Sequence, residues 1–131
     1  MSKVKDFFAA RYHSFGHAFR GWGYVLRTQP NTWIHAFITV AVFLMALWLK
    51  LPVSHWAVLM VMTAVVWAAE FINTAIEAVV DLVSPEEHPL AKVSKDVSAA
   101  AVLVTALIAV LVGLLILGPP LWSRLSTFIG R

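Results

Sequence analysis

A run of twelve residues, EFINTAIEAVVD at 70–81, carries the side chains best suited to chemistry. On an α-helix, which turns about 100° per residue, Glu77 lies ~20° from Glu70 and Asp81 lies ~20° from it on the other side. Asn73 flanks the same line. These four residues form a polar line, which we call the acidic stripe, on a helix whose other faces are mostly Ala, Val and Ile.

Carboxylates aligned in this way suit two kinds of chemistry. They are oxygen ligands for Mg²⁺, which usually keeps phosphate oxygens in its coordination shell, and a partly desolvated glutamate can act as a general base. Ionisable residues within an apolar helix indicate function by default. The plainer interpretation is a helix that emerges into water at Glu70. Proton transport is a further alternative, but the other long apolar segments contain no acid, so catalysis is favoured.

The sequence contains none of the glycine-rich phosphate loops or kinase signatures that bind nucleotides. If nucleotide phosphates are bound, we expect His88, Lys95 and Asp96 to contact them. Lys95 also suits the membrane surface, and Asp96 also suits the first turn of a helix. His13 and His17 have a spacing compatible with zinc, but no third ligand is nearby and we expect no metal site there.

The composition defines the kind of protein that must position these residues. Of 131 residues, 60% are hydrophobic and 13% are charged, and the mean hydropathy is +0.81. Soluble domains carry about 25% charged residues, so a soluble globular protein is excluded, and the chain is too hydrophobic to be disordered. The net charge of +3 reflects scarce charge rather than a basic patch, so we expect no nucleic-acid partner.

We expect one domain over residues 1–131, with the fold of an all-α membrane protein. Residues 4–27 have the pattern of an amphipathic helix in the membrane interface, with an aromatic face at positions 8, 12, 15, 19 and 22. Three membrane helices follow, at 33–49, 56–80 and 97–117. The loop at 84–96 holds most of the remaining charge, and the run SAAA at 98–101 favours close helix packing.

The distribution of cations predicts the orientation in the membrane. Five Lys or Arg residues precede the first membrane helix and two lie in the 84–96 loop, against three on the opposite side. The amino terminus and this loop are therefore expected in the cytoplasm, with the carboxyl terminus outside.

The acidic stripe, followed by HPLAK at 88–92 and by Lys95-Asp96, resembles the small prokaryotic diacylglycerol kinase and undecaprenol kinase family. The resemblance covers nearly the whole chain. It implies a homotrimer of the cytoplasmic membrane, with active sites shared between subunits, that transfers the γ-phosphate of ATP to a lipid alcohol using Mg²⁺. Motif similarity favours undecaprenol over diacylglycerol as the acceptor. A non-catalytic scaffold that keeps the fold and a proton-conducting or transport subunit are the alternatives.

The resemblance also implies roles for individual residues. Glu70 corresponds to the catalytic base, Glu77 to a metal-binding carboxylate, and Asn73 to a supporting residue of the same site. Nucleotide contacts are implied for residues in four parts of the chain: His17, Gln29, Glu77, Asp81, Glu86, Glu87, His88, Lys95 and Asp96.

Gln29 departs from the family pattern, which usually has a glutamate metal ligand at this position. A glutamine offers a carbonyl oxygen without the charge, so the departure weakens the expected metal binding more than the expected reaction. Asn31 and His35 agree with the undecaprenol branch and are expected to support substrate binding.

Overall fold

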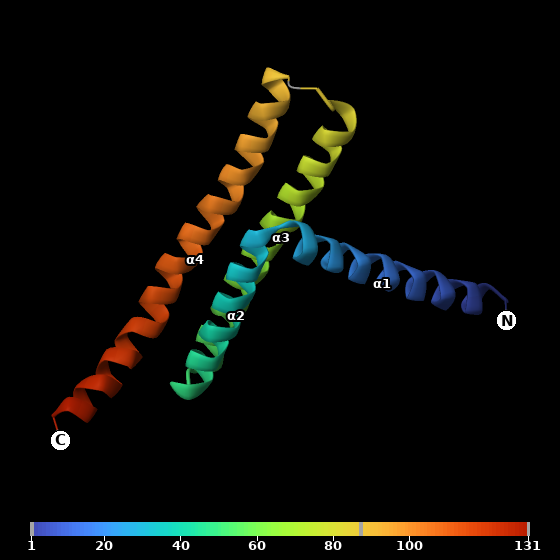
Figure 1. The fold of residues 1–131 in the computed structure, drawn as a ribbon. Helices are drawn as coiled ribbons and strands as arrows, with labels where there is room; N and C mark the ends of the chain where they lie inside the picture. Colours follow the sequence, from blue (N-terminus) through green and yellow to red (C-terminus); the bar gives the residue numbers. More distant parts are fainter. Residues whose placement is uncertain (1, 87, 131) are drawn as a thin grey trace. The chain divides into compact units, whose positions relative to one another are not determined.

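Four helices make up most of the chain in the computed structural model, which describes residues 2–86 and 88–130. They are α1 (Ser2–Thr28), α2 (Pro30–Trp48), α3 (Val53–Val83) and α4 (Pro89–Ile129) (Figure 1). The described residues contain no strand, so the all-α prediction is confirmed, and the last three helices are long and apolar enough to cross a membrane. The chain divides into two compact units, residues 1–33 and residues 34–131.

Helix α1 forms most of the first unit. The aromatic residues predicted to share a face lie on this one helix and their side chains are exposed, as expected of a helix that offers an apolar face to lipid. The helix ends at Thr28 because a proline two residues later disfavours helical dihedral angles at Gln29. Pro30 then begins α2, where its missing N–H is not required for a helical hydrogen bond.

In the second unit, a tight turn joins α2 to α3. Lys50 adopts a left-handed conformation with a φ of 54°, and the N–H of Leu51 donates to the carbonyl of Ala46 at 3.1 Å. This bond satisfies one of the last carbonyl groups of α2. A cluster of buried apolar residues lies at this turn and includes one residue of α4: Ala46, Leu51, Leu59 and Leu117. We call this region the hairpin end of the unit.

Helices α3 and α4 pack against each other along their length and run in opposite directions (Figure 1). His88 caps the amino terminus of α4: its Nδ1 accepts a hydrogen bond from the N–H of Leu90 at 3.2 Å. Residues 89–96, expected in a loop, are therefore helical, because a cap followed by Pro89 starts the helix early. Asp96 lies about two turns inside α4, so its interpretation as a first-turn acid is wrong.

Helix α4 also continues further than the sequence predicts. The run Gly118-Pro119-Pro120 was expected to end the membrane helix, yet α4 passes through it to Ile129. Prolines are tolerated inside membrane helices when neighbouring groups stabilise the helix. Here Arg124 donates a hydrogen bond to the carbonyl of Trp48 at the end of α2, and its guanidinium lies 4.7 Å from the centre of the Trp48 ring. This contact holds the final turns of α4 against the hairpin end.

Most large apolar side chains on α2, α3 and α4 are exposed in the single chain. A soluble protein would bury such surface, whereas a membrane helix can leave it to lipid or to another membrane protein. About 20 residues cross the hydrocarbon core of a bilayer, so α3 with 31 residues and α4 with 41 residues extend beyond it. The chain is a multi-pass membrane protein with long helices that can carry polar residues at their ends.

The hairpin end gives a prediction on stability. Leu59→Ala should lower the free energy of unfolding by about 2–5 kcal/mol, because it leaves a cavity in a packed core. Leu59 is 3% exposed, whereas its neighbour Met60 is 57% exposed, so Met60→Ala is a matched control that should cost about 0.5 kcal/mol or less. Titration of both purified variants with SDS measures the difference, and an equal loss in the two would contradict the packing described here.

Candidate active site

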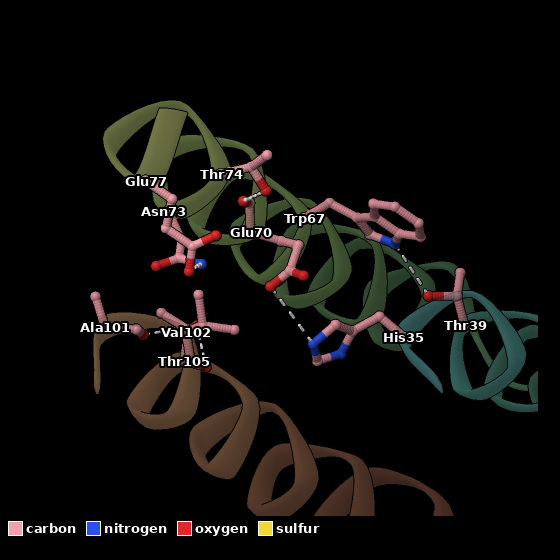
Figure 2. Close-up of polar contacts among 10 residues, drawn as sticks. All are labelled: His35, Thr39, Trp67, Glu70, Asn73, Thr74, Glu77, Ala101, Val102 and Thr105. Atoms are coloured by element: carbon pink, nitrogen blue, oxygen red, sulfur yellow. Dashed lines mark hydrogen bonds and ion pairs between the residues drawn. The ribbon is translucent and has the colours of Figure 1, made fainter. Parts of the chain in front are cut away.

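Glu70 is a buried carboxylate on α3, with 3% of its surface exposed. Its Oε2 lies 3.9 Å from Nε2 of His35 on α2, too far for a direct hydrogen bond but close enough for electrostatic interaction. Figure 2 shows the carboxylate directed toward the imidazole, and it shows the Thr74 hydroxyl donating to the carbonyl of Glu70. The predicted catalytic base thus lies inside the helix packing, beside a titratable side chain from a neighbouring helix.

Asn73 connects the acidic stripe to α4. Its Nδ2 donates to Oε1 of Glu77, one turn further along α3, at 3.1 Å. Its Oδ1 accepts from the hydroxyl of Ser98 on α4 at 2.7 Å. Asn73 is 6% exposed and Ser98 is 7% exposed. Both polar ends of a buried amide are therefore satisfied, one by an acid of the stripe and the other by the opposite helix.

The outer end of the stripe carries an ion pair. Lys95 Nζ on α4 donates to Oδ1 of Asp81 at 2.5 Å, and both side chains are exposed to solvent. Lys95 precedes the uncharged segment 97–117. Its hydrogen bond with Asp81 raises the pKa of Lys95, and the negative charges of Asp81 and Glu77 raise it further. The ammonium group therefore stays protonated at neutral pH and places a positive charge at this end of the stripe.

An open pocket of about 760 Å³ lies where α3 connects to α4. Such a volume is within the range of small-molecule sites. Five of the residues implied in nucleotide binding line it: Asp81, Glu86, His88, Lys95 and Asp96. Glu87, the sixth residue implied in this region, lies outside the described residues. We call this feature the connection pocket.

The three acids of the stripe are widely spaced along the axis of α3. At 1.5 Å per residue, Glu70 and Asp81 are about 16 Å apart along the helix axis, with Glu77 about 10 Å from Glu70. Asp81 lines the connection pocket, whereas Glu70 is buried between helices. The stripe therefore runs from a buried carboxylate to an open pocket at the connection between α3 and α4.

Three of the implied residues lie in the first unit, so their contact with the stripe stays a prediction. His17 is on α1, where its Nδ1 lies 2.9 Å from a guanidinium nitrogen of Arg20. Gln29 lies between α1 and α2; its N–H donates to the carbonyl of Val25 at 3.0 Å. Asn31 is exposed in the first turn of α2.

Sequence reasoning missed two contacts at this site. Ser98 was interpreted only as part of a small-residue packing run, although its hydroxyl bonds Asn73. A lone serine among alanines, opposite a predicted polar stripe, was the available signal. His88 was expected to contact nucleotide, and the structure gives it a role as the helix cap of α4. The sequence His-Pro-Leu at the start of an apolar run was a signal for that cap.

Sequence comparison identifies relatives over most of the chain. A family model described as prokaryotic diacylglycerol kinase matches residues 16–117. The undecaprenol kinase of Bacillus subtilis (strain 168) is 39% identical over 110 residues, which cover 84% of this chain and 89% of that protein. The diacylglycerol kinase of Synechocystis sp. is 46% identical over 111 residues, which cover 84% of this chain and 63% of that protein. The diacylglycerol kinase of Escherichia coli (strain K12) is 35% identical over 79 residues, or 60% of this chain and 62% of that protein.

The family match agrees with the helices and with the polar residues gathered between α3 and α4. The scaffold and transport alternatives are not favoured, since each of these relatives is named a lipid kinase. A kinase of this kind implies ATP as the phosphoryl donor and a lipid as the acceptor. The chain belongs to the prokaryotic diacylglycerol kinase family and is a membrane lipid kinase, a phosphotransferase acting on a lipid alcohol.

Proposed function

We propose that this kinase phosphorylates undecaprenol at the cytoplasmic face of the inner membrane, with Glu70 as the general base. The observation that carries the proposal is the burial of the Glu70 carboxylate between apolar helices, 3% exposed and beside His35. The sequence supports undecaprenol over diacylglycerol. The resemblance of the residues favours the undecaprenol branch, and Asn31 and His35 in particular match the undecaprenol pattern.

In this mechanism the lipid hydroxyl gives its proton to Glu70 while its oxygen attacks the γ-phosphorus of ATP. The bond from that phosphorus to the β,γ-bridging oxygen breaks, and ADP leaves. Phosphoryl transfer depends mainly on positioning and on stabilising charge. His35 lies beside the Glu70 carboxylate, and the Thr74 hydroxyl donates to the Glu70 carbonyl within the same helical segment, so both contacts position the proposed base.

The connection pocket would hold the nucleotide. Lys95 offers a positive charge to the phosphates and exchanges its contact with Asp81 for a contact with phosphate when ATP is bound. The exposed residues His88 and Glu86 border the same pocket. We also assign Asp96, Glu87 and His17 to nucleotide binding, as the family pattern implies.

Glu77 would hold Mg²⁺, which would neutralise negative charge on the transferring phosphate. The described residues contain no group of three or more His, Asp or Glu that could hold a metal alone. Magnesium is usually bound by one or two carboxylates together with substrate phosphates, so Glu77, whose Oε1 accepts from the Asn73 amide, fits a metal that arrives with the nucleotide. Gln29 would add a neutral carbonyl oxygen to this set.

We further propose a homotrimer with shared sites and with the 84–96 segment in the cytoplasm. One chain offers a single acidic stripe, and its three membrane helices leave extensive apolar surface exposed. Neighbouring chains would cover part of that surface and complete each site. The excess of Lys and Arg before the first membrane helix and in the 84–96 segment supports the orientation.

The function is tested by the transfer of labelled phosphate from ATP to undecaprenol and to diacylglycerol by the purified protein. We expect a kcat/KM for undecaprenol at least tenfold above that for diacylglycerol. Glu70→Gln tests the base. The substitution keeps the shape of the side chain but should lower kcat by about 10²-fold or more, the usual scale of general acid–base catalysis. A preference for diacylglycerol would refute the acceptor, and near-normal turnover of the variant would refute the base.

Shared sites give a second prediction. Chains with Glu70→Gln and chains with Lys95→Ala should each be nearly inactive alone. Mixed trimers should recover part of the activity, because some sites then combine an intact Glu70 from one chain with an intact Lys95 from another. Phosphate transfer after mixing in detergent measures the recovery. No recovery in trimers that are demonstrably mixed would mean that each site is built from one chain.

The departure at Gln29 gives a third prediction. Gln29→Glu should lower the Mg²⁺ concentration for half-maximal activity, because it adds a charged oxygen to the metal site. Gln29→Ala should change little. The initial rate at saturating ATP, titrated with Mg²⁺, compares both variants with the parent. Unchanged midpoints would indicate that Gln29 only contributes to the turn between α1 and α2.

A further inference from the structure

The side chain of Asn73 is held between two helices by two different partners. On α3 its Nδ2 donates to Oε1 of Glu77 at 3.1 Å. On α4 the hydroxyl of Ser98 lies 2.7 Å from its Oδ1. Asn73 and Ser98 are 6% and 7% exposed, so water cannot readily replace either contact. The orientation of the amide is therefore decided by these two neighbours.

An asparagine amide has nearly the same shape when rotated by 180°, but its hydrogen-bonding ends exchange. In the observed orientation the NH₂ group faces the Glu77 carboxylate and the oxygen faces a hydroxyl donor. The rotated amide would direct its oxygen at the carboxylate of Glu77, where two acceptors would repel each other. It would also lose the acceptor that Ser98 now bonds. A donor at position 98 thus favours the one orientation in which Asn73 donates to Glu77.

We propose that Ser98 is a positioning residue for the metal carboxylate, acting on Glu77 through Asn73. The inference rests on the proposed role of Glu77 in holding Mg²⁺. With the Asn73 amide held, one oxygen of Glu77 is engaged in a defined hydrogen bond and the carboxylate keeps one rotamer. The other oxygen then has a defined direction toward a nucleotide-bound ion. Without the Ser98 hydroxyl, the amide and the carboxylate would sample several orientations, and part of the binding energy of the ion would be lost to ordering them.

Ser98 is also connected to the cationic end of the site. Its Oγ lies 2.9 Å from the carbonyl oxygen of Lys95, one turn earlier on α4. Lys95 in turn pairs with Asp81 on α3. The hydroxyl has a single proton, so its two acceptors compete for it, and the shorter contact is the one to Asn73. The serine therefore links α4 to the acidic stripe at the level of Glu77, between the buried base and the connection pocket.

The test compares Ser98→Ala with Ser98→Thr, which keeps a hydroxyl, and with Ser126→Ala, a matched control on an exposed turn of α4. Binding of Mn²⁺ in the presence of a non-hydrolysable ATP analogue is followed by electron paramagnetic resonance, without lipid acceptor. Ser98→Ala should raise the Kd for Mn²⁺ by roughly three- to tenfold, as expected for the loss of one hydrogen bond. Ser98→Thr and Ser126→Ala should bind like the parent, and the KM for the lipid should not change in any variant.

A second measurement separates positioning from simple stability. If Ser98 acts through Asn73, Ser98→Ala should change the Mn²⁺ affinity little in a protein that already carries Asn73→Ala. Equal effects in both backgrounds, or parent-like Mn²⁺ binding by Ser98→Ala, would overturn the inference. Failure of the parent to phosphorylate either lipid would instead refute the proposed function, since the metal measurement requires no acceptor.

Discussion

The site depends on keeping carboxylates inside a helix that is otherwise apolar. Removing an ionised group from water costs free energy that only hydrogen bonds, opposite charges or a bound ion can return. The protein meets this cost differently along α3. Glu70 is buried beside His35, Glu77 accepts from Asn73, and Asp81 pairs with Lys95 in solvent. The helix therefore presents acids of graded burial, from the buried Glu70 to the exposed Asp81 at the connection pocket.

The partners of these acids come from α4 as well as from α3, and this makes the contact between the two helices part of the candidate site. Small residues at 98–101 let the backbones approach closely. Close approach in turn allows a side chain as short as serine to reach Asn73 on the opposite helix. A bulky apolar residue such as leucine at position 98 would separate the helices and remove the donor. The packing and the polar network thus require the same small residue.

The apolar packing and the polar contacts of the second unit lie at opposite ends. Apolar packing lies at the hairpin end, where α2, α3 and α4 meet around Ala46 and Leu117. Polar contacts lie at the other end, where the acidic stripe faces α4. The long apolar surface between them stays exposed in the single chain. Such a chain has little core of its own, which agrees with a protein whose apolar surface lies in a membrane.

The sequence by itself determined the fold class and the location of the acidic stripe. Helical periodicity is local, so the alignment of Glu70, Glu77 and Asp81 follows from their spacing alone. The apolar runs likewise required three membrane helices, because their lengths match a bilayer. The family signature supplied the kind of reaction, since it combines the stripe with the residues that follow it.

Only the tertiary structure decided which groups the stripe meets. The pairing of Asn73 with Ser98, of Asp81 with Lys95, and of Glu70 with His35 joins residues that are far apart in the chain. Their meeting depends on how two helices rotate about their axes when they pack, and no local pattern encodes that rotation. The same holds for the passage of α4 through Pro119 and Pro120, where contacts with other residues override the local preference of the backbone.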